Sequence, residues 1–195
     1  MKSRRIFVFL FVLCSMTLFA APSQSVENGR EKITGTFVSR SGRSSGQTRQ
    51  FTLTINRYTP PNQLRELNEA RTNGGQDQLI DKLDDMDAGR IAIGTGVGVR
   101  ANAVIADPWS EGGRRIIVLY ERDIRFFELR YGTRSSDYRI GYAELYIDRN
   151  GRGEGTLIPA ARVRLRGGNT WEVEDFGVFP ARLVNLRSSG RIEPR

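Results

Sequence analysis

The sequence predicts a mainly β fold, an antiparallel sandwich or small barrel with a two-helix insertion at residues 61–87. Apolar and polar residues alternate through Gln50–Arg57, as they do along a half-buried strand. Two helical patterns follow the Pro60–Pro61 pair. From Ala88 onward, short β-rich segments are separated by turn signals to the end of the chain.

The N-terminus, residues 1–25, has the pattern of a secretory signal peptide. A basic start precedes an apolar stretch from Ile6 to Phe19, and the small residues Ala20 and Ala21 follow. We expect cleavage between residues 20 and 25. The apolar stretch is too short to span a bilayer comfortably, and no later one approaches 18 residues, so no membrane span is expected after cleavage.

The composition excludes much of the usual catalytic chemistry. The chain has no histidine, and its one cysteine, Cys14, lies in the signal. Serine–histidine and cysteine–histidine nucleophiles, catalytic thiols and zinc sites are therefore excluded from the mature chain. Residues 26–187 are expected to form one domain stabilised by its core without disulfides, followed by a frayed tail at 188–195. No cofactor or metal is predicted.

The mature chain is basic through arginine. It has 27 basic and 22 acidic residues, and all the basic residues except Lys32 and Lys82 are arginines. Arginine makes bidentate contacts with carboxylates, phosphates and sulfates that lysine cannot reproduce. This bias indicates either recognition of an anionic ligand or the codon usage of a GC-rich genome.

The first half contains two expected strands and two expected helices. Strands are predicted at residues 33–39 and 50–57, joined by a loop at 40–46. The helices are predicted at 62–72 and 76–86, separated by Asn73–Gly74–Gly75. The second helix has an apolar stripe and an acidic face, which lacks the spacing of a calcium loop and is interpreted as solvated or as a counter-charge for arginines.

The second half is predicted to be strands and turns. The run 91–99 reads as one strand with a nearly bare glycine face, and Arg114–Glu121 contains four consecutive apolar residues, as expected where both faces are covered. Strands at 124–131 and 138–147 follow, and then a tight turn at Asp148–Arg152.

The last hairpin shows alternating charges on both strands. Placing Leu165 opposite Val173 sets Arg166 opposite Glu172 and Arg164 opposite Glu174, so each arginine there has an acidic partner. Short segments at 176–179 and 181–186 are expected to complete the domain.

Four segments between residues 127 and 186 carry a resemblance to other proteins: Phe127–Arg130, Arg134–Tyr138, Gly151–Leu157 and Pro180–Asn185. On these segments the chain resembles a loose group of uncharacterised exported bacterial proteins. The resemblance implies export to the periplasm or extracellular space of a bacterium and carries no activity with it.

Two polar groups are candidates for function. Arg134, Ser135, Ser136 and Tyr138 form a cluster that could hold an anionic group, and the same residues are also typical of a turn. Without histidine, the enzymatic alternative is a carboxylate pair of the glycosidase type, for which Glu128 and Glu144 are the candidates.

The prediction from sequence is an exported, non-catalytic binding or structural module of the cell envelope or extracellular space. Its partner is unknown; an anionic glycan or another anionic envelope component is the class that the arginines indicate. Nucleic acid is not expected, since export separates the chain from it and acids are interleaved with the arginines. The alternative is a carboxylate-dependent hydrolase of envelope polysaccharide.

Overall fold

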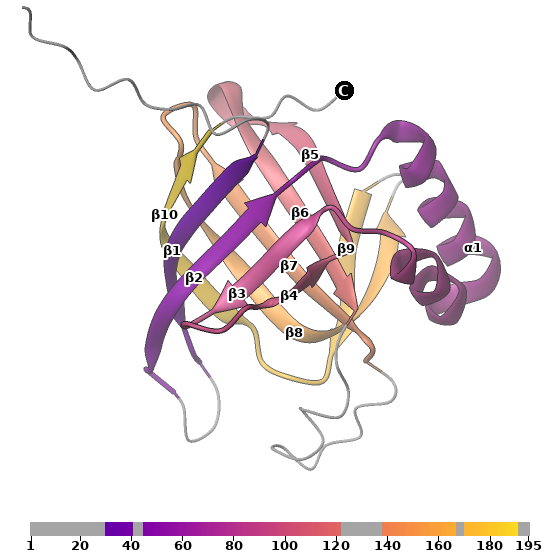
Figure 1. Cartoon of the computed structure of the whole chain (residues 1–195). Coiled ribbons are helices and arrows are strands. Elements are labelled where there is room, and N and C mark those ends of the chain that lie inside the picture. Colours follow the sequence, from indigo (N-terminus) through magenta and orange to yellow (C-terminus); the bar gives the residue numbers. More distant parts are fainter. Residues whose placement is uncertain (1–29, 41–44, 122–137, 167–169, 191–195) are drawn as a thin grey trace, which may run out of the picture.

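The computed structural model describes residues 30–40, 45–121, 138–166 and 170–190, and it shows one antiparallel sheet with a helical insertion (Figure 1). The strands are β1 (Glu31–Val38), β2 (Thr48–Ile55), β3 (Gly89–Ile93), β4 (Val99–Ala101), β5 (Ala103–Trp109), β6 (Gly113–Glu121), β7 (Ile140–Ile147), β8 (Arg152–Arg166), β9 (Thr170–Phe176) and β10 (Ala181–Ser189). The helix α1 (Pro61–Asp84) follows β2, and a single 3-10 turn, η2 (Ser110–Gly112), joins β5 to β6. The predicted mainly β fold with a helical insertion is confirmed.

The strand order is β4-β3-β2-β1-β10-β8-β7-β6-β5, with β9 paired to β8 beside this path. The C-terminal strand β10 therefore lies between β1 and β8 and joins the two halves of the sheet. The path does not close, but Thr59 covers part of the β5 edge. Its amide donates to the carbonyl oxygen of Val104 (2.8 Å), and its hydroxyl accepts from the amide of Val104 (3.0 Å).

Apolar side chains fill both sides of the sheet. The inner side is the first core, which includes Phe51, Leu53, Val118 and Leu145. The second core lies on the outer side of β5–β8 and is covered by α1 and β9. The four-residue apolar run of β6 divides between them, with Ile116 and Val118 in the first core and Ile117 and Leu119 in the second. The expectation that both faces of this strand are covered is confirmed.

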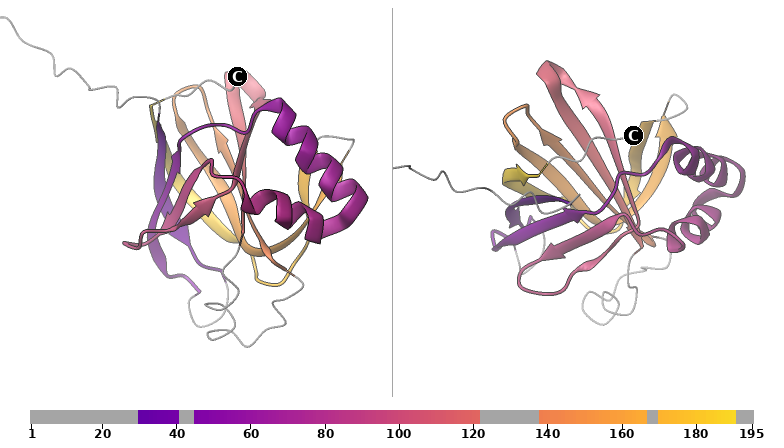
Figure 2. Two further views of the ribbon diagram at one scale, coloured as in Figure 1. Left: turned by 45° about the vertical axis from the view of Figure 1, so that its right-hand side comes forward. Right: turned by 45° about the horizontal axis from the view of Figure 1, so that its top comes forward.

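The insertion is one helical element broken at Gly75. This residue has φ 69° and ψ −150°, a conformation that side chains other than glycine rarely adopt. Figure 2 shows the two helical segments meeting at an angle beside the sheet. The side chains of Arg71 and Gln76, on either side of the break, both donate to the carbonyl oxygen of Val163 on β8 (2.7 and 2.6 Å).

The structure corrects two details of the predicted elements. The run 91–99 is not one strand: β3 ends at Ile93 and the chain turns back into β4 at Val99. In the last hairpin, Arg164 lies opposite Glu172 and Leu165 opposite Trp171, a shift of two residues from the predicted register. The shift keeps every side chain on its expected side, so the alternation fits both registers.

Two further predictions concern the last strand and the strand expected at residues 124–131. The last strand continues to Ser189, two residues into the range expected to fray. The strand predicted at 124–131 lies outside the described residues. In the part of the chain that the structure describes, no helix combines the length and the apolar character needed to cross a bilayer.

The outer side of the sheet is covered only in part. Side chains of β5–β9 and α1 build the second core there, whereas the outer side chains of β1, β2 and β10 belong to neither core. In Figure 1, α1 accordingly lies beside β5 and β9, away from β1 and β10. The strands β1, β2 and β10 thus present an uncovered polar surface.

Candidate functional site

Of the predicted ligand-binding cluster, only Tyr138 belongs to the described residues. Arg134, Ser135 and Ser136 lie outside the described residues. Tyr138 is described, and its hydroxyl donates a hydrogen bond to Oδ2 of Asp175 on β9 (2.6 Å). This bond is the main cause that lowers the pKa of Asp175. Tyr138 therefore contributes to the contact between β9 and the residues before β7.

Of the two predicted catalytic acids, Glu128 also lies outside the described residues and Glu144 is engaged by its neighbours. Oε1 of Glu144 accepts hydrogen bonds from Nε of Arg115 and from the hydroxyl of Tyr146 (2.8 Å). Nη2 of Arg115 in turn donates to the carbonyl oxygen of Trp171 (3.1 Å). These bonds tie β6, β7 and β9 together, an arrangement that does not favour Glu144 as a hydrolytic acid.

A buried polar network lies at the end of the first core. Glu31 is fully buried, and its carboxylate accepts from Tyr58 (2.9 Å), from Ser188 (2.6 Å) and from both terminal nitrogens of Arg114. Burial alone would lower the pKa of Arg114, but the hydrogen bond to Glu31 and the charges of Tyr58 and Glu31 outweigh it and raise that pKa. Arg114 therefore remains a cation paired with Glu31.

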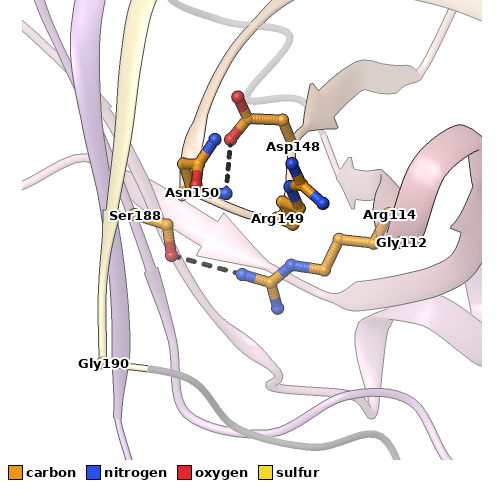
Figure 3. Close-up of a pocket in the computed structure, with 8 residues that line it drawn as sticks. Gly112, Arg114, Asp148, Arg149, Asn150, Ser188 and Gly190 are labelled. Carbon is orange, nitrogen blue, oxygen red and sulfur yellow. Dashed lines mark hydrogen bonds between the residues drawn. The ribbon is translucent and has the colours of Figure 1, made fainter.

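A pocket of about 240 Å³ opens beside this network. Figure 3 shows Arg114 pointing toward Ser188, with Asp148, Arg149 and Asn150 of the adjoining turn beside them. Within the turn, Oδ1 of Asp148 accepts from the amides of Asn150 and Arg152 (2.8 Å each). The amide of Arg152 is the main cause that lowers the pKa of Asp148.

The charges around the pocket balance one another. Arg114 is already paired with Glu31, and the carboxylate of Asp148 lines the pocket together with the other lining arginine, Arg149. The pocket therefore offers no excess of positive charge to an anion, so we place the candidate site on the uncovered outer side of the sheet instead.

Exposed cations gather on that outer side. We define the basic face as the five exposed, outward-facing cations of β3, β1, β10 and the start of β8. They are Arg90, Lys32, Arg182, Arg187 and Arg152. Between the outermost members lie four strand spacings, or about 19 Å. Threonines occupy positions between these cations, because Lys32 lies opposite Thr54 and Arg187 opposite Thr34.

Two arginines of the basic face lie directly opposite each other. Arg187 on β10 pairs in register with Arg152 on β8. Among the described residues neither lies within ion-pair distance of a carboxylate, although the charge of Arg152 contributes to lowering the pKa of Asp148. By contrast, Arg182 lies 3.5 Å from the carboxylate of Glu154. Like charges directly opposite on adjacent strands destabilise a sheet. The arrangement therefore leaves a local excess of positive charge at this end of the basic face.

An aromatic pair lies on the same outer side. Trp109, the last residue of β5, is 46% exposed, and its ring centroid lies 4.8 Å from that of Tyr146 on β7. Burial, followed by the hydrogen bond to Glu144, raises the pKa of Tyr146. The phenol therefore keeps its proton at neutral pH and donates to Glu144.

Sequence reasoning missed the basic face because its members come from distant segments. Lys32, Arg152 and Arg187 become neighbours only through the order β1-β10-β8, which no local pattern encodes.

Within the described ranges, no three potential metal-ligating side chains of the Asp, Glu, Cys or His type cluster together. No protein-family model, curated protein or solved structure matches the chain.

Proposed function

We propose that this protein is an exported, non-catalytic binding module whose basic face holds an acidic polysaccharide of the cell envelope or extracellular space. The observation that carries the proposal is the opposed pair Arg152 and Arg187. A carboxylate or sulfate group between two guanidinium groups would remove their repulsion and accept charge-assisted hydrogen bonds from both. The repulsion between the two arginines thus favours the binding of an anion there.

The length of the basic face favours a chain of charges over a single small anion. Arg90 and Arg152 lie at opposite ends of a row of about 19 Å, with Lys32 between them. A polymer with repeated acidic groups can contact several cations at once, so that weak single contacts add up. A small anion would use only one end of the row.

The side chains between the cations of the basic face favour a polyanion that is a glycan over other polyanions. Along β1, β2, β10 and the first residues of β8, the outward side chains near the cations are mostly threonines, which can exchange hydrogen bonds with sugar hydroxyls. The outward side chains of these described strands include none of the large apolar anchors of a membrane-surface element.

The test compares polymers that differ in one property. Dextran sulfate and dextran share a backbone and differ in charge; polygalacturonate carries carboxylates instead of sulfates; polyphosphate carries charge without sugar. Binding of each to the purified protein is measured at 50 and at 500 mM NaCl. We expect binding of dextran sulfate and polygalacturonate that falls steeply with salt, and no binding of dextran.

Two double variants each remove two positive charges, one inside the basic face and one outside it. The double variant R152Q/R187Q should weaken binding about tenfold, since two exposed ion contacts of roughly 0.7 kcal/mol each make up the 1.4 kcal/mol of a tenfold change. The control R164Q/R166Q removes two arginines at the far end of β8, which contact Glu172, and should leave affinity within about twofold. Equal effects of the two variants, or equal binding of dextran and dextran sulfate, would refute the proposal. Polyphosphate binding as tight as dextran sulfate binding would refute the glycan assignment.

A further inference from the structure

Trp109 is a large apolar side chain left exposed beside the basic face. The chain has two tryptophans; Trp171 is fully buried in the second core, whereas Trp109 is 46% exposed at the end of β5. Single exposed apolar residues are ordinary on protein surfaces. Trp109, however, is paired with a second ring, because Tyr146 lies 4.8 Å away with its plane inclined by 54°.

Tyr146 is fixed in position by a chain of hydrogen bonds. Its hydroxyl donates to Glu144, Glu144 accepts from Arg115, and Arg115 donates to the backbone of Trp171 on β9. Rotating Tyr146 away from Trp109 would break the first of these bonds. Tyr146 is therefore held in place before any ligand arrives, and a rigid surface loses little entropy on binding.

The pair continues the basic face on the same side of the sheet. Tyr146 lies opposite Glu154 on β8, and Arg152 is the next outward residue of that strand. On the other flank of Tyr146, Arg115 lies opposite Asp107. Polar groups thus surround the rings, which suits a ligand whose faces are apolar and whose rim carries hydroxyls.

We propose that Trp109 and Tyr146 form a stacking site for one pyranose ring of the polysaccharide that the basic face binds. The proposal rests on the proposed function and names its substrate class more closely. The C–H face of a pyranose packs on an aromatic ring through dispersion and loss of apolar hydration, and the hydroxyls at its rim can reach the neighbouring polar groups. This contact needs no charge on the sugar and should persist in salt that screens the basic face.

The test uses the exposed tryptophan as its own reporter. Acrylamide, which is uncharged, quenches exposed indoles, so quenching in this protein reports mainly on Trp109 because Trp171 is fully buried. Hexagalacturonate and the neutral sugars isomaltohexaose and cellohexaose are titrated at 1 M NaCl. We expect at least one of them to lower the quenching constant about twofold or more at saturation.

Matched variants then separate stacking from loss of folding. Trp109→Ala should weaken high-salt binding of the protecting sugar at least fivefold, as measured by calorimetry, whereas Trp109→Phe, which keeps a ring, should retain most of it. Phe179→Ala removes a ring that is 68% exposed and contacts Phe176, and it should leave the affinity unchanged. Thermal unfolding of each variant checks that the fold is kept.

The failures of the two proposals are distinguishable. If no sugar protects Trp109 at 1 M NaCl, or if Trp109→Ala binds as tightly as the original protein, the stacking site is refuted, while salt-dependent binding that needs Arg152 and Arg187 leaves the basic face standing. If Trp109 is protected but R152Q/R187Q binds acidic polymers normally at low salt, the stacking site stands and the basic face is refuted.

Discussion

At the scale of single residues, Glu31 is the one charged residue that is buried in the described part of the fold. Its carboxylate is fully buried and is compensated by donors from three other segments, namely Tyr58 after β2, Arg114 on β6 and Ser188 on β10. Taking a charge out of water costs several kcal/mol unless paired groups replace the lost hydration. Glu31 therefore stabilises the fold only as long as Arg114 and the hydroxyls remain in place.

Replacing Glu31 with glutamine keeps its shape and removes its charge. Arg114 is then left partly buried without a counter-ion, so we expect Glu31→Gln to lower the free energy of unfolding by about 3 kcal/mol. Urea unfolding followed by circular dichroism measures the loss. The control is Glu66→Gln on α1, because Glu66 and Lys82 are half exposed and 3.9 Å apart; its cost should stay below about 1 kcal/mol. Similar costs for the two variants would contradict the role given to the network.

Asp148 predicts how stability changes in acid. Its folded-state pKa lies below the ordinary aspartate value of 3.8, chiefly because the amide of Arg152 donates to the carboxylate. A carboxyl group whose pKa is lower in the folded state adds stability. This stability is fully present above the pKa of the unfolded chain and is lost as the pH falls through the pKa of the folded state. Asp148→Asn keeps an oxygen acceptor for the turn and removes the titration. Below about pH 4, the original protein should therefore lose stability more steeply than the variant, as read from urea midpoints between pH 2 and 7.

The contrary result for Asp148 is also informative. Parallel pH profiles of the two proteins would show that the turn carboxylate is equally protonated in the folded and unfolded chains. Asp81→Asn, on an exposed part of α1, serves as the control for removing one negative charge from a basic protein.

At the scale of elements, alternation predicted which side a residue faces better than it predicted its partner. Along β8 and β9 the residues face the expected sides, yet Glu172 lies opposite Arg164 and not Arg166, since a shift of two preserves alternation. The break between the two helical segments was readable because Gly75 takes a conformation that disfavours other residues. The turn between β3 and β4 was missed because its glycines also fit a bare strand face.

The opposed arginines of β8 and β10 predict an unusual gain of stability. Arg187→Glu places an acid opposite Arg152 and should raise the free energy of unfolding by about 0.2–1 kcal/mol, because opposite charges across strands attract. The control Arg182→Glu makes the same exchange on β10, on the other side of its β-bulge. It removes the partner of Glu154 and should lower the free energy of unfolding. Urea unfolding in 50 mM salt compares the three proteins. A loss of stability in Arg187→Glu would show that the pair already has a compensating partner.

At the scale of the whole molecule, the candidate site depends on the order of the strands. The sequence indicated a β fold, an apolar strand covered on both sides and a ligand class suited to arginine. It could not show that β10 lies between β1 and β8, because β1 and β10 pair across a separation of up to 157 residues, which no local pattern encodes. Only that order brings Lys32, Arg187 and Arg152 to one surface.

The two cores share β5, β6 and β7, so we expect the domain to unfold as one unit. Leu79 on α1 is fully buried in the second core, and Leu79→Ala should lower the free energy of unfolding by about 2–5 kcal/mol. In a Trp109→Phe background, fluorescence of Trp171 reports the second core and circular dichroism reports the sheet. Their urea midpoints should fall together. A Trp171 transition that precedes the sheet transition would instead show that α1 and β9 detach separately.

The position of β10 also governs when the sheet can form during synthesis. Ser189 contacts the backbone of Lys32 from 157 residues further along the chain, and without β10 the strand order separates into two incomplete sheets. A ribosome must therefore release almost the entire chain before β1 acquires its second neighbour. This delay would suit the export that we propose, because a chain still missing its central strand stays unfolded enough to thread through a translocation pore.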